Sequence, residues 1–172
     1  LGDVYKRQGN TVIDAILNVS KRDCRFSIPD IDFEKDKVIL ATIHRRENWG
    51  DNLSNICLGL LEIIRIHEDV KILLPFHPNK IVQNPIKNIL GNERRVFLVK
   101  PLEYIELVHV LKLCFFVITD SGGIQEEAPT FDKPVLITRE KTERTEGIEV
   151  GTSKLVGTDK KEIFDAANQL LT

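Results

Sequence analysis

Short apolar runs alternate with amphipathic stretches along most of the chain. The apolar runs are rich in β-branched residues and predict buried strands over residues 38–42, 71–75, 95–99, 114–119, 134–138 and 153–156. Between them, apolar residues recur at helical spacing and predict helices over residues 52–67, 81–90, 104–112, 123–128 and 159–171. Apolar strands that alternate with helices are typical of a parallel sheet covered on both faces. We therefore expect an α/β fold: a Rossmann-like, doubly wound parallel sheet of about six strands.

The first 37 residues lack this alternation. Residues 1–8, LGDVYKRQ, resemble a translated non-native linker and are left out of the fold; a solvated tail is the alternative. A short helix is predicted up to Val19, capped by Asn10 or Thr11, and a polar connector follows it to residue 37. We expect the folded domain to cover residues 38–172.

Composition limits the classes of protein to which this chain can belong. The chain has 172 residues, enough for one domain, with 24 Lys and Arg against 26 Asp and Glu. A net charge of -2 offers no electrostatic argument for nucleic acid or an anionic membrane as a partner. No apolar run has the length of a membrane span and no signal peptide is visible, while the absence of an initial Met predicts a fragment. Cys24, Cys57 and Cys114 have neither metal-ligand nor redox spacing, which favours reduced thiols in the cytoplasm and no metal site.

Ligands of doubly wound sheets bind beyond the carboxyl ends of the strands, so the loops there are candidate sites. The segment ITDSGGIQEEAP follows the most apolar strand and opens a helix, with Ser121, Gly122 and Gly123 at its start. Unpaired amides and the helix dipole favour an anion there, and glycines allow close approach, so a diphosphate fits. Glu126 or Glu127 has a carboxylate suited to the hydroxyls of a ribose. A tight turn with a capping residue and a solvated helix face is the alternative.

Three other loops at the same edge carry polar side chains. The first strand is followed by His44, Arg45, Arg46 and Glu47, and the second and fifth strands are followed by loops that contain His77 and Arg144. Arginines can pair with phosphates in a two-pronged way, and a histidine can donate to a phosphate or act as an acid. For the first loop the alternative is a charged surface turn in which Asp51 or Asn52 caps the next helix. For His77 the alternative is a structural role, and for the loop of Arg144 it is an exposed charged loop. Together the loops predict a site for a phosphorylated ligand.

Several motifs resemble one family. They are GNTVIDA (9–15), HRREN (44–48), TDSGGIQEEAP (119–129), KPVL (133–136), TER (142–144) and KLVGTD (154–159). From Gly9 almost to Thr172 the chain resembles the C-terminal half of the bacterial, non-hydrolysing UDP-N-acetylglucosamine 2-epimerases. The resemblance implies one half of a GT-B architecture, in which residues 9–37 come from the interdomain region and the complete enzyme is a homodimer. It also implies interconversion of UDP-N-acetylglucosamine and UDP-N-acetylmannosamine for surface polysaccharides, by elimination and re-addition of UDP, without NAD or a metal.

The resemblance assigns roles by position. Ser121, Gly122 and Gly123 match the diphosphate-binding turn, Glu127 the ribose-binding glutamate, and Arg144 an arginine of the UDP site. His44 matches a histidine that assists departure of UDP, and is the candidate catalytic residue of this chain. The segment from Leu102 to Leu107 matches the one against uracil, although the family often has Gln and Phe at these two ends. The residues Arg45, Glu47 and His77 match a site for an activating second UDP-N-acetylglucosamine.

Two departures and one gap qualify the resemblance. Lys80 and Thr145 stand where the family has proline, which affects loop rigidity more than chemistry. The family's acids for proton transfer at C2 lie in its N-terminal domain, so we expect these 172 residues alone to be catalytically silent. The alternatives are the donor-binding domain of a GT-B glycosyltransferase, a non-catalytic UDP-sugar-binding module and a purely structural remnant.

Overall fold

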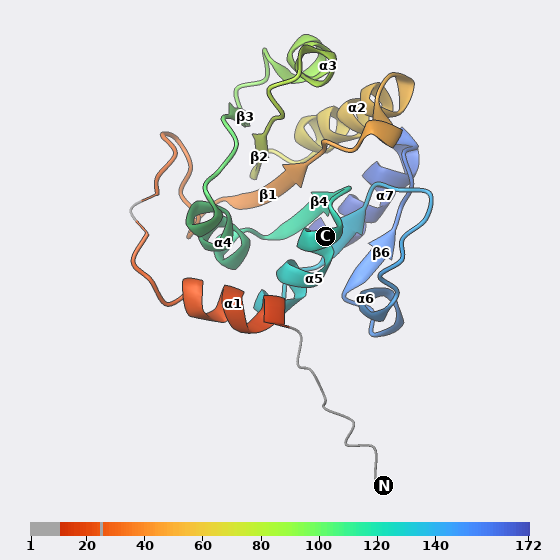
Figure 1. Ribbon diagram of the computed structural model, residues 1–172. Coiled ribbons are helices and arrows are strands. Elements are labelled where there is room, and N and C mark those ends of the chain that lie inside the picture. The colour runs from red at the N-terminus through yellow and green to blue at the C-terminus, as the bar shows by residue number, and fades with distance from the viewer. Residues whose placement is uncertain (1–10, 25) are drawn as a thin grey trace, which may run out of the picture.

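Six parallel strands form one sheet in the computed structural model, which describes residues 11–24 and 26–172 (Figure 1). The predicted linker, residues 1–8, and the candidate cap Asn10 lie outside the described residues. The strands are β1 (Lys37–Thr42), β2 (Val70–Pro75), β3 (Val96–Val99), β4 (Phe116–Thr119), β5 (Val135–Ile137) and β6 (Ser153–Leu155). Their order in the sheet is β3-β2-β1-β4-β5-β6. This order is that of a doubly wound Rossmann-like sheet, as the alternation of apolar runs and helices predicts.

Helices cover both faces of the sheet (Figure 1). One face packs against α2 (Asp51–Ile66), α3 (Lys80–Leu90) and α7 (Lys160–Leu171). The other packs against α1 (Thr11–Val19), α4 (Tyr104–Leu113) and α5 (Gly122–Glu127). Three short elements complete the description: the 3-10 helices η1 (Arg46–Asn48) and η2 (Ala128–Phe131), and the single turn α6 (Glu146–Glu149).

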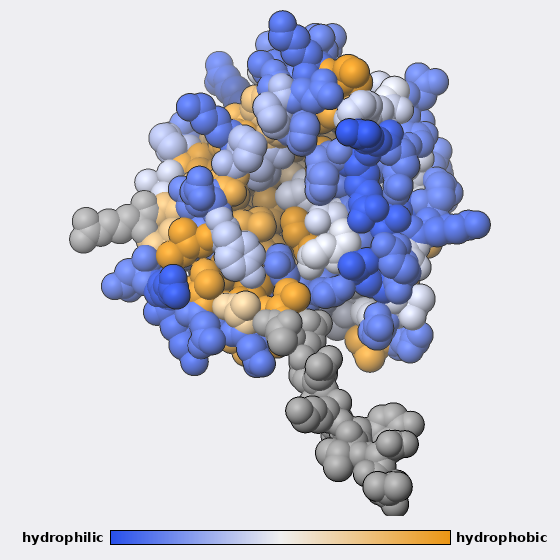
Figure 2. Space-filling model, viewed as in Figure 1, coloured by the Kyte–Doolittle hydropathy of each residue, from blue (hydrophilic) through white to orange (hydrophobic). Residues whose placement is uncertain are grey.

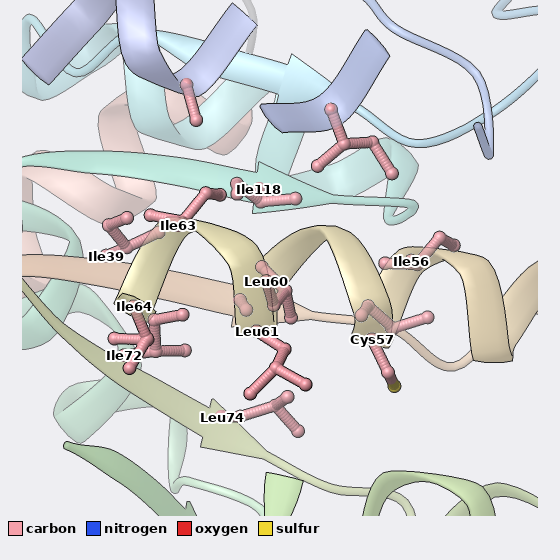
Figure 3. Packing of buried hydrophobic residues seen from close by; sticks show 14 of the residues in the cluster. Ile39, Ile56, Cys57, Leu60, Leu61, Ile63, Ile64, Ile72, Leu74 and Ile118 are labelled. Atoms are coloured by element: carbon pink, nitrogen blue, oxygen red, sulfur yellow. The ribbon is translucent and has the colours of Figure 1, made fainter. Parts of the chain in front are cut away.

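Alternate residues of each central strand enter two separate cores. In β1, Ile39 lies in the core beneath α2, whereas Leu40 lies in the core beneath α1 and α4. In β4, Ile118 lies in the first core and Val117 in the second. Figure 3 shows the α2 side of this packing, in which Leu60, Ile63 and other side chains of α2 lie against side chains of the strands. Burial on both faces is the reason why these strands are apolar throughout.

Several element ends differ from the sequence-based expectation. The predicted cap of α2 at Asp51 or Asn52 is wrong, because Asp51 is already helical and Gly50 precedes the helix with φ 85°. The predicted strand at 114–119 begins later, because Cys114 ends α4 and its N–H donates to Val110 O at 2.7 Å. Asp159 caps α7, because its carboxylate accepts from the N–H groups of Lys161 and Glu162.

Cys57 and Cys114 are buried free thiols, as their apolar sequence context predicts. Burial raises the pKa of each of these two thiols to about 12, so both stay protonated at neutral pH. Within residues 11–24 and 26–172, none of the helices combines the length and the apolar character that a membrane crossing requires.

Candidate functional site

The strand order reverses between β1 and β4, and this switch point organises the site. From β1 the chain continues to β2 and β3 on one side, and from β4 it continues to β5 and β6 on the other. Thr42 and Thr119 end the two strands as register partners, and their hydroxyl oxygens lie 2.6 Å apart in the buried interior. The loops that follow them diverge toward opposite faces and leave a crevice at the carboxyl edge.

A cavity of about 370 Å³ occupies this crevice. Its walls come from the loops after β1, β2, β3 and β4 and from the beginnings of α4 and α5. The candidate residues that line it are His44, His77, Leu102, Leu107, Ser121, Gly123 and Glu127. Figure 2 shows that apolar side chains gather over α1 and α4 on the face in view, while hydrophilic side chains surround them. A partly apolar cavity with a few polar groups is typical of small-ligand sites.

The start of α5 presents polar groups to this cavity. Ser121 precedes the helix with an extended backbone, and its side chain makes no capping hydrogen bond. Its own N–H donates to the Thr119 hydroxyl at 2.9 Å. The Ser121 hydroxyl and the first amides of the helix are therefore available as donors to an anion.

Arg144 lies at the same helix start but on its other side. A Cβ atom at Gly122 would lie 2.9 Å from Arg144 Cζ, so the guanidinium occupies the space next to this glycine. Arg144 Nε donates to Glu126 at 2.6 Å and its terminal nitrogen donates to Glu143 at 2.9 Å. Together with Glu126, Arg144 lines a neighbouring hollow of about 640 Å³ and not the cavity of His44.

Gly122→Ala and Gly123→Ala form a matched test of this contact. We expect Gly122→Ala to destabilise the protein by about 1 kcal/mol or less, because the new methyl group must displace the far end of a flexible, partly exposed side chain that two carboxylates hold. At Gly123 the nearest atom to a new Cβ is the Ser121 hydroxyl at 4.0 Å, so Gly123→Ala should be neutral or slightly stabilising. Denaturant unfolding of the two variants measures the difference. Equal stability of both would contradict the predicted cost of displacing the Arg144 guanidinium.

Glu127 forms one wall of the cavity with Tyr104. The Tyr104 hydroxyl donates to Glu127 Oε1 at 3.4 Å. Burial raises the pKa of Glu127, the Tyr104 hydrogen bond opposes this effect, and the charge of Glu126 adds to it. Leu102 and Leu107 pack partly buried against the adjacent core. The pairing of an acceptor with an apolar wall suits a ribose joined to a flat base.

The three residues matched to an activator site do not share one cavity. His77 lines the cavity described above. Arg45 lies beyond the β1 end, where its N–H donates to Asp120 at 2.9 Å. Glu47 points toward Arg139, whose Nε donates to it at 2.7 Å.

Asp120 is a residue of the site that sequence reasoning did not single out. Its side chain is fully buried and accepts the N–H groups of His44 and Arg45 at 3.0 and 2.9 Å and the Asn48 amide at 3.0 Å. Burial raises the pKa of Asp120, while the backbone donors, the charge of His44 and the Asn48 side chain oppose that rise. The carboxylate thus joins the loop after β1 to the loop after β4. Its only sequence signal is its place directly after a buried strand, because its partners are distant along the chain.

Comparisons with known proteins agree on one family. Residues 6–172 match the family model described as UDP-N-acetylglucosamine 2-epimerase. The UDP-N-acetylglucosamine 2-epimerase of Bacillus subtilis is 46% identical over 165 residues, which cover 95% of this chain and 43% of that protein. Across the curated relatives the chain spans about half the length, 43% for the Bacillus protein and 46% for the Escherichia coli enzyme.

Two solved structures align closely with this fold. Staphylococcus aureus MnaA in a co-structure with UDP has a TM-score of 0.87 and 41% identity, covering 95% of this chain and 43% of that one. The UDP-GlcNAc 2-epimerase of Neisseria meningitidis bound to UDP-GlcNAc has a TM-score of 0.86 and 38% identity, covering 95% and 46%. Both similarities extend over nearly the whole sheet and its helices.

Proposed function

The chain belongs to the UDP-N-acetylglucosamine 2-epimerase family, and from this membership we propose that it holds the UDP part of UDP-N-acetylglucosamine in the cavity between the ends of β1 and β4. The observation that carries the proposal is that His44 and Ser121, which follow different strands at the switch point, line one cavity. The relatives solved with UDP and with UDP-GlcNAc support the same ligand class.

Different groups around the cavity bind different parts of UDP. The Ser121 hydroxyl and the amides of Gly122 and Gly123 donate to the diphosphate, and Arg144 supplies positive charge from the adjoining hollow. Glu127 accepts from the ribose hydroxyls, and the apolar wall from Leu102 to Leu107 lies against uracil.

In the complete enzyme, this half serves the departure and return of UDP. The reaction interconverts UDP-N-acetylglucosamine and UDP-N-acetylmannosamine: elimination gives UDP and 2-acetamidoglucal, and UDP adds again after the proton returns to the other face of C2. His44 donates to the diphosphate and so stabilises the negative charge that grows as the bond to the sugar breaks. The acids that move the C2 proton belong to the N-terminal domain of the complete protein, which adds the other half of a GT-B architecture.

We infer the wider setting from the same family resemblance. The complete protein is a cytoplasmic homodimer that supplies precursors for surface polysaccharides, and the buried, reduced Cys57 and Cys114 support that compartment. Arg45, Glu47 and His77 take part in binding an activating second sugar nucleotide. Residues 38–172 form the UDP-binding domain, and residues 9–37 connect it to the N-terminal domain.

Titration calorimetry with UDP tests the site. We expect Ser121→Ala and Arg144→Ala each to weaken UDP binding by about 1–2 kcal/mol, because the first removes a donor to the diphosphate and the second removes positive charge beside the start of α5. Ser20→Ala and Arg22→Ala, which change the same residue types just after α1, serve as controls and should bind as the unaltered chain does. Unchanged affinity in both site variants would contradict the assignment.

The reaction of the complete enzyme separates the epimerase from a glycosyltransferase and from a binding module, because all three would bind UDP. Formation of UDP-N-acetylmannosamine from UDP-N-acetylglucosamine without an acceptor identifies the epimerase. Transfer that requires an acceptor, or binding without turnover, would favour the other two.

A further inference from the structure

The carboxylate of Asp120 is fully buried, and it accepts hydrogen bonds from one loop. Its three hydrogen-bond donors, the N–H groups of His44 and Arg45 and the Asn48 amide, all come from the segment after β1. Asn48 also donates to the Thr138 carbonyl at 3.0 Å, so this segment has a second anchor that does not involve Asp120. A buried charge is costly unless it is paired, so a carboxylate here needs a reason beyond anchoring a loop.

The imidazole of His44 explains why a buried carboxylate stands at position 120. His44 Nδ1 lies 3.4 Å from Asp120 Oδ1, and the His44 side chain is 47% exposed. Among the described residues, this contact is the one ion pair in which Asp120 takes part. With Nδ1 directed at the carboxylate, Nε2 lies on the opposite side of the ring, and His44 is part of the cavity wall. A carboxylate beside Nδ1 selects the tautomer with a proton on that nitrogen and favours the charged ring.

We propose that Asp120 is a positioning residue that holds His44 as an imidazolium, with Nδ1–H toward Asp120 and Nε2–H toward the diphosphate. The inference rests on the proposed function, since it assigns a charge state to the residue that assists departure of UDP. Neutral His44 with Nδ1–H would present only a lone pair to a phosphate, so the second proton is needed for donation.

The proton balance of the reaction follows from this arrangement. During elimination, a base of the N-terminal domain removes the proton at C2, and the electron pair of that bond forms the double bond between C1 and C2 of the sugar. The bond between C1 and the β-phosphate oxygen breaks, and its electron pair stays on that oxygen. Nε2–H donates a hydrogen bond to the same oxygen and keeps its proton, so the imidazolium beside Asp120 balances the negative charge of the departing UDP. During re-addition, an acid of the N-terminal domain protonates C2 with the electron pair of the double bond, and the oxygen of UDP attacks C1 while Nε2–H remains on His44.

Nitrogen chemical shifts of the four histidines in the 172-residue chain test the charge state directly. His44→Gln identifies the His44 signals. In the complex with UDP at neutral pH, we expect both His44 ring nitrogens to be protonated. A neutral His44 ring in that complex would overturn the proposal, and this measurement needs no variant of Asp120.

Asp120→Asn and Asn48→Ala separate positioning from anchoring. Both remove a hydrogen bond between the two loops, but only Asp120→Asn removes the charge beside the imidazole. We expect Asp120→Asn to give a neutral His44 ring in the UDP complex and to weaken UDP binding roughly tenfold. Asn48→Ala should keep the imidazolium signature. The same signature loss in Asn48→Ala would mean that loop anchoring alone explains the effect, and would overturn the proposal.

A double-mutant cycle completes the test. His44→Gln should weaken UDP binding roughly tenfold in the unaltered chain and by less than about twofold in the Asp120→Asn background, because the donor is already lost there. Additive losses would contradict the inference while leaving the UDP site intact. Failure of the unaltered chain to bind UDP would instead contradict the proposed function itself.

Discussion

Glu127→Gln should weaken UDP binding by about 3 kcal/mol, roughly a hundredfold, because a charged acceptor of the two ribose hydroxyls becomes a neutral amide. The same change should leave the free protein at least as stable as before. Burial raises the pKa of Glu127, which means that its ionised form is penalised in the folded state. Glutamine has the same shape without that penalty and can still accept the Tyr104 hydrogen bond.

The pKa shift of Glu127 determines how the stability difference between Glu127→Gln and the unaltered chain changes with pH. A carboxyl whose pKa is higher in the folded state than its ordinary value of 4.5 binds more protons when folded than when unfolded. Its contribution therefore lowers stability as pH rises from that value through the folded-state pKa. The Gln variant lacks this decline, so its advantage is absent in acid and fully present at neutral pH.

Calorimetric titration with UDP and denaturant unfolding over a pH series measure the two effects. Glu68→Gln, which changes an exposed glutamate after α2, is the matched control and should alter neither quantity. Unchanged UDP affinity in Glu127→Gln would show that the Glu127 carboxylate does not bind the ribose hydroxyls. A stability loss at neutral pH would show that the Glu127 carboxylate is favoured, and not penalised, in the folded protein.

Phe116→Ala should reduce the free energy of unfolding by about 3–5 kcal/mol, because it opens a large cavity at the centre of the sheet. Phe116 is 0% exposed, belongs to the core beneath α2 and opposes Ile39 of β1 in the strand register. A loss of this size is a large part of the stability of a typical domain. Because β4 carries Asp120 and the Ser121 turn, UDP binding should fail at lower denaturant concentrations as well.

The adjacent residue provides the control. Phe115 is 42% exposed, and its ring has Lys37 Nζ, at the beginning of β1, 5.7 Å from the centroid. Phe115→Ala should cost less, about 1–2 kcal/mol, since a large part of the side chain is already exposed. Equal losses from the two substitutions would contradict the strand assignment that places one ring inside and one outside.

The strands could be predicted because each is apolar throughout, and their alternation with helices determines a parallel sheet. Element ends were less predictable. Gly50, and not Asp51 or Asn52, precedes α2, because a positive φ of 85° suits glycine. The turn α6 at Glu146–Glu149 was missed, since four mostly polar residues carry no amphipathic period.

Some residues of the site could likewise be predicted from the sequence, and others could not. The rule that ligands bind at the carboxyl ends of strands points to the loops of His44, His77 and Ser121, and the structure places these residues around one cavity. No local pattern indicates that Leu102 and Leu107 form its wall; only the family resemblance does. The pairing of Arg144 with Glu126 and Glu143, and the burial of Asp120 beneath His44, depend on side-chain contacts across loops. Such contacts leave no periodic signal in the sequence.

Backbone amide signals of the chain during a titration with UDP test the central claim most directly. The account predicts that the largest changes fall on Gly122 and Gly123, with accompanying changes at His44, because the diphosphate binds at the start of α5. Largest changes at Gly147 and Val150 in the neighbouring hollow, or no changes at saturating UDP, would contradict it.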